Sequence, residues 1–477
     1  MIELSFILFL LLFVGVGLSS AWYAKKSRND YYLASRSVSP CLTGLSAVAT
    51  NNSGYMFIGV IGFTYTTGLA AVWLMVGWIV GDFIGSLFIH RKLREVTERT
   101  NEASFAAVLA HWNGEEFRLW RRIAAVVMLM FLGAYAAAQI SAGGKALQGV
   151  LGWNPATGAV VVAAMILAYS VAGGIRASIW TDAAQSTVML AAMSLLFIVG
   201  VLGQGGVSVA IDKMTAVPGF LDLFPSSLLF PGAIGMGLFV LGWMFAGFSV
   251  VGQPHVMVRF MALDDTANLV RARVWYYGYF TAFYALATGV GMLSRLYLPE
   301  LGDMDPELAL PTMALELLPA IFVGMILAGI FAATMSTADS LVLSCSAAIT
   351  HDLLPKRSDS TLHAKLATAA VTVLALLIAM SETQSVFQLV ILSWSTLASA
   401  FAPLLTIYAL DRRISEAGAI AAMAVGITTA IGWRLLDWHT MVYEGMPGIL
   451  AGTIVAMAMS QVVPRRQERA IALAQEP

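Results

Sequence analysis

The sequence predicts an all-α integral membrane protein. Of its 477 residues, 59% are hydrophobic and only 12% are charged, and the mean hydropathy is +0.79. Apolar stretches of about 20 residues, the length that crosses a bilayer as a helix, recur along the chain. The few lysines and arginines lie mostly between these stretches, in alternate loops. A soluble core of this length does not need so few charges, so the chain is expected to fold in lipid.

Thirteen apolar stretches follow one another in a single polytopic domain that covers residues 1–477. The first stretch, 4–23, is followed by positive charge at Lys25 and Lys26. A cleaved signal peptide carries its positive charge before the apolar run, so this stretch is predicted to be a retained extra N-terminal helix. The other twelve predicted spans lie at 42–65, 69–90, 123–147, 155–173, 180–203, 232–256, 274–298, 315–346, 364–381, 385–410, 415–434 and 443–463.

The positive charges predict the orientation in the membrane, because cytoplasmic loops hold an excess of lysine and arginine. With the N-terminus outside, only Lys145, Lys213, Arg295 and Arg434 fall outside, and the remaining lysines and arginines fall inside. The C-terminus is then cytoplasmic, with a tail, 464–477, that is too short for an appended catalytic or signalling domain. The expected location is the cell (inner) membrane, crossed many times.

The composition and the loops add further expectations. A net charge of −1 without a long basic run gives no reason to expect a nucleic-acid partner, and no obligate protein partner is inferred. Cys41 and Cys345 both lie in apolar surroundings, so neither a disulfide framework nor a metal site is expected. The segment 103–112, in a cytoplasmic loop, is expected to form a short interfacial helix. The longest external loop, 204–231, is expected to pack onto the helices.

Two spans carry residues that interrupt a membrane helix. The stretch 42–65 contains the polar run 50–54, and the stretch 232–256 carries Gly242, Gly247 and Gly252 and ends near Pro254. Non-helical backbone inside a membrane is tolerated where it lines a cavity, and paired interrupted helices point to a transporter's midplane site. After the extra first helix, these spans are the first and sixth of twelve. Their spacing predicts two five-helix inverted repeats, 42–203 and 232–410, followed by two C-terminal helices within 415–463. The alternative is that glycine and asparagine merely mark helix crossings.

A stripe of hydroxyl groups runs along one predicted helix, between Phe331 and Ser346. At 100° per residue one face collects Ala333, Ser336, Thr337, Ser340 and Ser344. Serine and threonine in membrane helices often bond back to the preceding turn or join helices, which is the alternative explanation. Asp339, in the same helix, favours an ion or substrate path, because a carboxylate within the membrane is costly. Neutral oxygens beside one carboxylate suit a hard cation such as sodium.

Five segments resemble the sodium:solute symporter family. They are AspTyrTyrLeuAlaSerArgSer at 30–37, LeuSerAlaValAlaThrAsnAsnSerGlyTyr at 45–55, TyrSerValAlaGlyGlyIleArgAlaSerIleTrpThrAsp at 169–182, GlyGlnProHis with ArgPheMetAla within 252–262, and AlaAlaThrMetSerThr at 332–337. The resemblance covers nearly the whole chain, and the order and spacing of the segments make it specific. It implies a LeuT-type fold and alternating access, in which two repeats rock around a shared site.

The resemblance also implies two sets of sodium ligands. The first set combines the backbone carbonyls of Ala49, Asn52 and Ala333 with the hydroxyls of Ser336 and Thr337. A possible second site comprises Asp182, Ser336, Asp339 and Ser340. The alternative for Asp182 or Asp339 is a structural pairing with a neighbouring helix.

The resemblance places a solute pocket at the two broken helices and their neighbours, formed by Asn51, Ser53, Tyr55, Tyr135, Gln139, Ala246, Val250, Pro254 and Trp394. Tyr135 and Gln139 share a helix face, and an interhelical hydrogen bond is the alternative role for each. The family's proline carriers have an aspartate where this chain has Asn51, a tryptophan at Ala246 and a tyrosine at Val250. The expected solute is therefore another amino acid, a small organic anion or a larger molecule in place of proline.

The sequence thus predicts a secondary active symporter that couples inward sodium flow to uptake of a small organic solute. Proton coupling through Asp182 or Asp339 is the main alternative. A transporter-like sensor would carry a signalling domain after the last helix. A membrane enzyme would need a convergent catalytic set, whereas the six histidines mostly lie at predicted helix ends. The expected partners are sodium, the solute and the lipid bilayer, and no catalytic residue is predicted.

Overall fold

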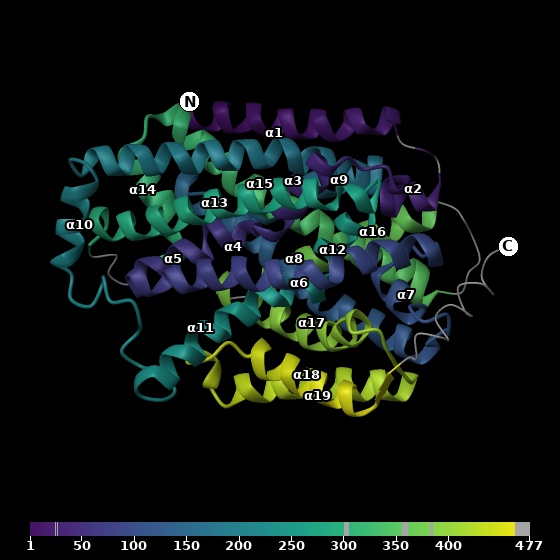
Figure 1. Cartoon of the computed structure of the whole chain (residues 1–477). Helices are drawn as coiled ribbons and strands as arrows, with labels where there is room; N and C mark the ends of the chain where they lie inside the picture. Colours follow the sequence, from purple (N-terminus) through teal and green to yellow (C-terminus); the bar gives the residue numbers. More distant parts are fainter. Residues whose placement is uncertain (24, 26, 300–304, 355–360, 382–384, 463–477) are drawn as a thin grey trace.

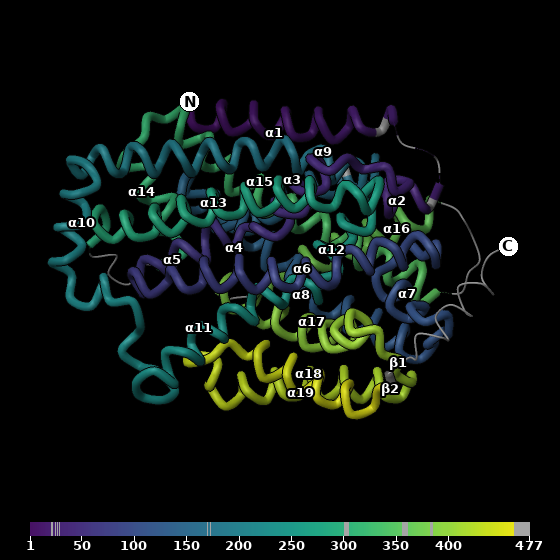
Figure 2. Tube along the Cα trace, in the orientation of Figure 1, coloured from purple at the N-terminus to yellow at the C-terminus, as the bar shows by residue number. Residues whose placement is uncertain are grey.

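The computed structural model describes residues 1–23, 25, 27–299, 305–354, 361–381 and 385–462. The described chain is almost entirely helical, which confirms the predicted all-α class. Its long helices lie side by side in one bundle, with connecting segments gathered at the two ends (Figure 1). The described strands are β1 (Arg412–Ile414) and β2 (Ser460–Val462), which pair antiparallel beside the last helices (Figure 2).

Nine helical segments in the described residues are long and apolar enough to cross a membrane, and two shorter apolar helices lie at Pro155–Ala168 and Gly445–Ala458. Many large apolar side chains on these helices point outward. Leu4, Leu8 and Leu11 of α1 (Ile2–Ser19), for example, are each more than half exposed. Exposed leucines along a helix are stable in contact with lipid. The structure is therefore that of a multi-pass membrane protein.

Each of the thirteen predicted spans is helical over most of its length. After α1, the first group of helices comprises α3 (Pro40–Asn51), α4 (Ser53–Phe57), α5 (Gly59–Thr67), α6 (Val72–Thr100), α8 (Arg118–Leu151) and α9 (Pro155–Gly203). The second group comprises α11 (Gly232–Phe248), α12 (Pro254–Met261), α13 (Leu269–Tyr297), α15 (Ala320–Ala347), α16 (Thr361–Ser381) and α17 (Val386–Ala409). The chain then forms α18 (Glu416–Leu435) and α19 (Gly445–Ala458).

The two predicted interruptions are present. The first span is divided at Asn52, which has a non-helical ψ of 3°, and again at Ile58, between α4 and α5. In the second span a 3-10 turn follows α11, and Gln253 is extended (φ −100°, ψ 100°) before Pro254 begins α12. Proline favours this break, because it disfavours the helical conformation for the residue before it.

A third break separates the predicted spans 155–173 and 180–203. Gly174 has φ 57° and ψ −144°, so α9 is two helices joined at this residue. A Cβ atom at position 174 would clash with the backbone and ring of Tyr31. Glycine is required here both for its left-handed φ and for the close approach of the chain.

Several boundaries differ from the prediction. The helix α6 continues ten residues beyond the predicted span 69–90, to Thr100. The predicted span 315–346 begins too early, because α14 (Ala309–Leu317) is a separate helix and α15 begins at Ala320, directly after Pro319. Leu318 is extended at this break, as a residue before proline usually is.

Of the two predictions about loops, the one for 103–112 is wrong about its position and the one for 204–231 is confirmed. The segment 103–112 does form a helix, α7 (Phe105–Ala110), but all six residues are buried, so it does not lie on the membrane surface. The Ser104 side chain caps this helix and holds it against the protein by binding the Asp352 carboxylate, at 2.8 Å. The loop 204–231 packs onto the helices as predicted, since Leu69 donates to the Phe220 carbonyl, and it contains α10 (Val207–Thr215).

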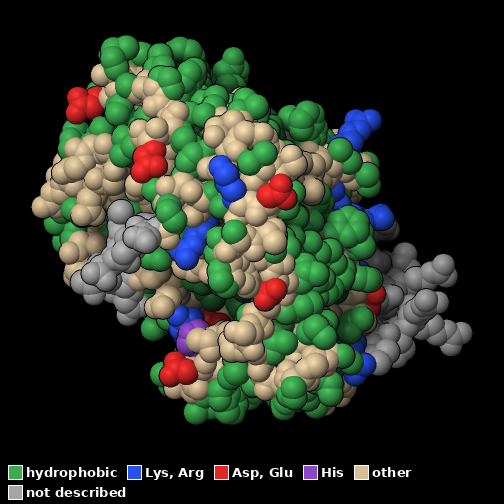
Figure 3. Space-filling view, turned by 90° about the vertical axis from the view of Figure 1, so that its left-hand side faces the viewer, with side chains coloured by type: hydrophobic (Ala, Val, Ile, Leu, Met, Phe, Trp, Pro, Cys, Tyr) green, Lys and Arg blue, Asp and Glu red, His purple; other side chains and the backbone are tan. Residues whose placement is uncertain are grey.

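The bundle surrounds a core made by both helix groups. The helix α1 lies along one edge against α9 and α15, and α18 and α19 lie along the opposite edge against α17 (Figure 1). The end of the bundle that carries α10 shows few charged side chains among many apolar ones (Figure 3). Residue 463 and the predicted tail, 464–477, lie outside the described residues.

Candidate functional site

The hydroxyl stripe of α15 lies against the end of α3. Thr337 Oγ1 donates to the Thr50 carbonyl at 2.8 Å, and Ser336 Oγ lies 3.1 Å from the carbonyl oxygens of both Ala49 and Ala333. The last carbonyls of a helix have no partner within the helix. Because α3 ends at the break, the Ala49 and Thr50 carbonyls are free to accept from α15.

These contacts bring together four of the five residues predicted for the first sodium site. The fifth, Asn52, forms the break itself and is fully buried, and its side-chain amide has no hydrogen-bond partner among the described residues. Carbonyl and hydroxyl oxygens without thiolate or imidazole form a ligand set typical of a hard cation. The residues present therefore fit sodium.

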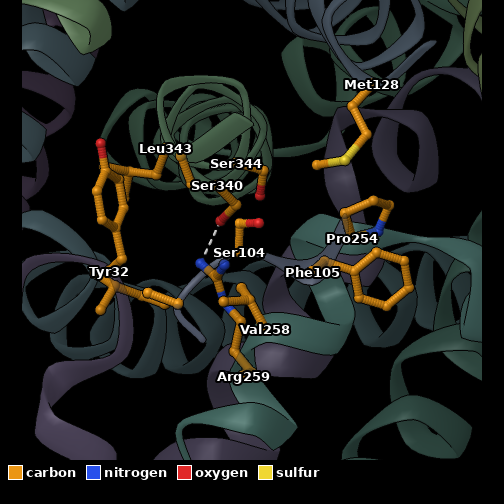
Figure 4. A pocket seen from close by; sticks show the side chains of 13 residues that line it. Tyr32, Ser104, Phe105, Met128, Pro254, Val258, Arg259, Ser340, Leu343 and Ser344 are labelled. Atoms are coloured by element: carbon orange, nitrogen blue, oxygen red, sulfur yellow. Dashed lines mark hydrogen bonds between the residues drawn. The ribbon is translucent and has the colours of Figure 1, made fainter. Parts of the chain in front are cut away.

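The possible second sodium site also contains Arg259, which the sequence analysis did not assign to it. Asp182 Oδ2 accepts from Ser46 Oγ at 2.6 Å and forms an ion pair with Arg259 Nη2 at 3.3 Å. The same guanidinium nitrogen donates to the Ser178 hydroxyl, at 2.7 Å, and to the Ser340 hydroxyl (Figure 4). All five side chains are buried. Asp182 is thus paired with a neighbouring helix, and Arg259 already supplies a positive charge at this position.

Ser340 connects the two groups. Its hydroxyl lies 2.6 Å from the Ser336 carbonyl, 3.0 Å from Asp339 Oδ1 and 3.3 Å from Thr50 Oγ1. Ser344, one turn further along the stripe, lines a small cavity of about 20 Å³ together with Arg259 (Figure 4). The predicted stripe is therefore a continuous polar face that leads from the break in α3 toward α7.

The predicted solute residues of α8 also meet the first break. The Tyr135 hydroxyl donates to Ser53 Oγ at 3.2 Å, and Gln139 Oε1 accepts from the Gly54 backbone N–H at 2.8 Å. These are the interhelical hydrogen bonds considered as the alternative role. They also hold α8 at the place where α3 gives way to α4.

Aromatic rings surround the second break. Trp394 of α17 donates its indole N–H to the Ala246 carbonyl at 3.0 Å, and its ring lies 5.3 Å from that of Trp78. Tyr55 stacks on Phe387, with ring centroids 5.2 Å apart. Ala246 and Val250, the two small residues of the predicted pocket, are fully buried, as is Pro254 at the start of α12. The sequence interpretation missed Trp78, His255 and Phe387, because aromatic residues in apolar helices carry no distinguishing pattern.

Several buried polar atoms at the two breaks have no hydrogen-bond partner among the described residues. They are Asn51 Oδ1, both side-chain polar atoms of Asn52, Tyr55 OH, Gln139 Nε2, Gln253 Oε1 and both ring nitrogens of His255. Buried polar groups in native proteins are nearly always hydrogen-bonded. These atoms are therefore available to a polar ligand.

A larger cavity of about 320 Å³ opens toward the end that carries α10. Its walls include Phe63, Trp243 and Phe387, with the ion pair of Arg434 and Glu444 at 2.7 Å on one side. Phe387 also stacks on Tyr55, so this residue contacts both the cavity and the first break.

Comparison with protein families and known proteins identifies relatives over nearly the whole chain. The model of the sodium:solute symporter family matches residues 31–426. The high-affinity proline transporter PutP of Bacillus subtilis is 30% identical over 461 residues, which cover 93% of this chain and 96% of that protein. The sodium/proline symporter of Escherichia coli is 29% identical, with coverage of 92% and 89%.

Solved structures show the same fold at lower sequence identity. A sodium-coupled sialic acid symporter, in a substrate-bound outward-open state, matches with a TM-score of 0.81 and 19% identity over 97% of this chain and 99% of that chain. MhsT in complex with L-phenylalanine matches with a TM-score of 0.57 and 15% identity, over 89% and 98% of the two chains. These likenesses confirm the LeuT-type fold.

Proposed function

The chain belongs to the sodium:solute symporter family, and from this premise we propose that it couples inward sodium flow to uptake of a small organic solute by alternating access. The protein is a transporter and not an enzyme. Sodium is a transported substrate in this proposal. The observation that carries it is the contact of Ser336 and Thr337 with the free carbonyls at the end of α3.

That contact supplies a physical basis for coupling. A sodium ion bound by Ala49, Asn52, Ala333, Ser336 and Thr337 would take its oxygens from both α3 and α15. The ion would therefore stabilise the arrangement in which these helices lie together. Its release into the cytoplasm would remove that stabilisation and allow the first repeat to move relative to the second.

A second sodium ion at Asp182, Ser336, Asp339 and Ser340 is a separate proposal. Asp182 and Ser340 both contact Arg259, so the ion could share their oxygens only if the guanidinium turned away. Two cations at one carboxylate would repel each other. We therefore propose that the protein binds one sodium ion in the conformation described here and transports one sodium ion with each solute.

We propose that the solute binds between the two breaks, in contact with Asn51, Ser53, Tyr55, Tyr135, Gln139, Ala246, Val250, Pro254 and Trp394. The relatives named above carry proline, and the mixture of apolar rings and unpaired polar atoms suits an amino acid or another small organic acid. Small residues at positions 246 and 250 favour a solute that is bulkier than proline.

In the membrane we propose thirteen crossings, with an extra N-terminal helix before two five-helix repeats and two helices after them. The nine long apolar segments of the fold account for nine of these crossings, and four more are proposed. One is the first broken span, which forms a single long segment with α6. The other three are the first half of α9, the helix α13 and the helix α19. The end with few positive charges, seen in Figure 3, then faces outward, and the N-terminus lies outside and the C-terminal tail inside. The protein is proposed to lie in the cell (inner) membrane.

Uptake into proteoliposomes with imposed gradients tests this function. The purified protein is given a panel of amino acids and small organic acids under an inward sodium gradient, a proton gradient, or neither. We expect uptake above the level of protein-free vesicles only with the sodium gradient. Uptake that follows the proton gradient and ignores sodium would establish the alternative, proton coupling.

A further inference from the structure

Asp82 is a buried carboxylate for which the transport proposal has no role. It lies in the middle of α6 and is fully buried. Two hydroxyls of α13 donate to it, Tyr276 at 2.6 Å and Tyr277 at 3.2 Å. Among the described residues no lysine or arginine forms an ion pair with it, although Arg273 attracts it from nearby. A carboxylate within a membrane helix is costly, so its presence calls for a role.

Tyr276 connects Asp82 to the first break. The side-chain nitrogen of Asn51 donates to the Tyr276 hydroxyl oxygen at 2.6 Å. A phenol has one proton to give, and the Tyr276 hydroxyl directs it at Asp82 Oδ2. Tyr276 therefore gives its proton to Asp82 and must accept from Asn51. This fixes the Asn51 amide with its nitrogen toward α13 and its oxygen on the opposite side.

The Asn51 amide oxygen, Oδ1, is a hydrogen-bond acceptor in the proposed solute pocket. Asn51 is the last residue of α3, next to the break, and its Oδ1 is buried without a hydrogen-bond partner among the described residues. A buried acceptor is stabilised by a ligand that brings an N–H or ammonium donor. The hydroxyls of the proposed sodium site bind the backbone carbonyls of residues 49 and 50. They do not bind Asn51 Oδ1, so this side-chain oxygen is not one of the proposed sodium ligands.

We propose that Asp82 and Tyr276 are positioning residues that hold the Asn51 amide oxygen for a nitrogen donor of the solute. The inference rests on the proposed function and narrows its solute class to molecules with an amine or ammonium group, such as amino acids. Organic anions without an N–H or O–H donor leave Oδ1 unsatisfied and bind weakly. A buried site built to bond a donor rejects an analogue that lacks it.

The chain offers a matched pair of variants for the test. Tyr276→Phe removes the link to Asn51, whereas Tyr277→Phe removes a second donor to Asp82 and leaves Asn51 untouched. The probes are the best transported of the twenty common L-amino acids and the carboxylic acid with the same side chain in which a hydrogen atom replaces the amino group. Sodium-driven uptake into proteoliposomes gives the KM for each probe, the maximal rate and the sodium concentration for half-maximal uptake.

For the unmodified protein we expect the amino acid to have a KM at least tenfold below that of the carboxylic acid without the amino group. Tyr276→Phe should reduce this preference below threefold, with the maximal rate and the sodium requirement changed less than twofold. Tyr277→Phe should behave like the unmodified protein. If Tyr276→Phe does not reach the membrane, Asp82→Asn replaces it, because an amide at position 82 can donate to Tyr276 and release the constraint on Asn51.

Each contrary result has a distinct meaning. Equal sodium-driven uptake of both probes by the unmodified protein overturns this inference and leaves the proposed function standing. Equal losses in Tyr276→Phe and Tyr277→Phe show general packing and overturn the positioning role. A changed sodium requirement with an unchanged solute preference assigns the acceptor to sodium. If no probe of the panel is driven by sodium, the proposed function fails and this inference fails with it.

Discussion

Ser336 and Ala49 are 287 positions apart in the chain, yet the Ser336 hydroxyl lies 3.1 Å from the Ala49 carbonyl oxygen. The contact joins the hydroxyl stripe of α15 to the end of a broken helix. Neither element has the complete oxygen set alone, because α3 supplies only carbonyls and α15 supplies the hydroxyls. The proposed sodium site therefore exists only while the two repeats are held in this arrangement.

The first prediction concerns sodium affinity. Ser336→Ala and Thr337→Ala each remove one oxygen of the proposed site, and we expect each to raise the sodium concentration for half-maximal uptake by roughly tenfold or more. A hydrogen-bonding group on a charged partner contributes about 1.5–3 kcal/mol, which corresponds to that change. The sodium dependence of solute uptake in proteoliposomes measures it.

The control for this prediction restores the oxygen. Thr337→Ser keeps the hydroxyl and loses only a methyl group, so its sodium requirement should stay within about fourfold of the unmodified protein, since one buried methyl contributes about 0.8 kcal/mol. An unchanged sodium requirement in both alanine variants would place the ion elsewhere.

The second prediction concerns the number of sodium ions. Arg259 contacts both Asp182 and Ser340, and we expect a sodium-to-solute ratio of one because the guanidinium holds the second site. The ratio is obtained from parallel fluxes of labelled sodium and labelled solute under one gradient. A ratio of two would show that Arg259 leaves Asp182 during transport.

The third prediction concerns the end of the bundle that carries α7. Arg121 of α8 forms an ion pair with Asp352 at 2.7 Å, and the carboxylate also binds Ser104 beside α7. The Asp352 side chain is fully buried, and breaking a buried pair by removing one partner costs about 3–5 kcal/mol. Arg121→Ala should therefore loosen α7 and expose the small cavity behind it.

Thiol labelling measures that opening. In a protein with Cys41→Ser, Cys345→Ala and Ser344→Cys, the new cysteine is the only one and lines the cavity, and we expect Arg121→Ala to raise its labelling rate by at least fivefold. Arg118→Ala is the control, because Arg118 is an exposed residue of the same helix that pairs with Glu116. Equal labelling rates in the two variants would show that the ion pair does not hold this end closed.

The sequence sufficed for features that depend on periodicity and on single interrupting residues. The spacing of Ser336 and Thr337 along a helix places them on one face regardless of what packs there. Asn52 and Pro254 weaken a helix locally. These signals need no knowledge of distant contacts, and the structure has the stripe and the two breaks where they were expected.

The missed features depend on packing between distant segments. Arg259 belongs to the ArgPheMetAla segment that resembles the family. Its ion pair can be recognised only once α12 is known to lie against Asp182. The sequence predicts that the segment of α7 lies on a membrane surface, whereas the helix is buried and packs against α8. Tyr276 gives no sign in the sequence that its hydroxyl lies between Asn51 and Asp82.

The last prediction concerns proline. Ala246 and Val250 stand where the family's proline carriers have aromatic side chains, and each missing wall removes apolar contact worth about 1–3 kcal/mol. We therefore expect proline to compete with the true solute only at millimolar concentration. Competition for sodium-driven uptake of the best solute of the panel measures this.

Trp394 determines how the pocket could be changed toward proline. Its indole N–H binds the Ala246 carbonyl, and Ala246 itself is fully buried, so a tryptophan at position 246 would collide with its surroundings while Trp394 is in place. Ala246→Trp together with Trp394→Ala should therefore improve competition by proline about tenfold over Trp394→Ala alone, because one aromatic wall is restored. If proline already inhibits the unmodified protein at micromolar concentration, residues other than those at 246 and 250 form the wall against its ring.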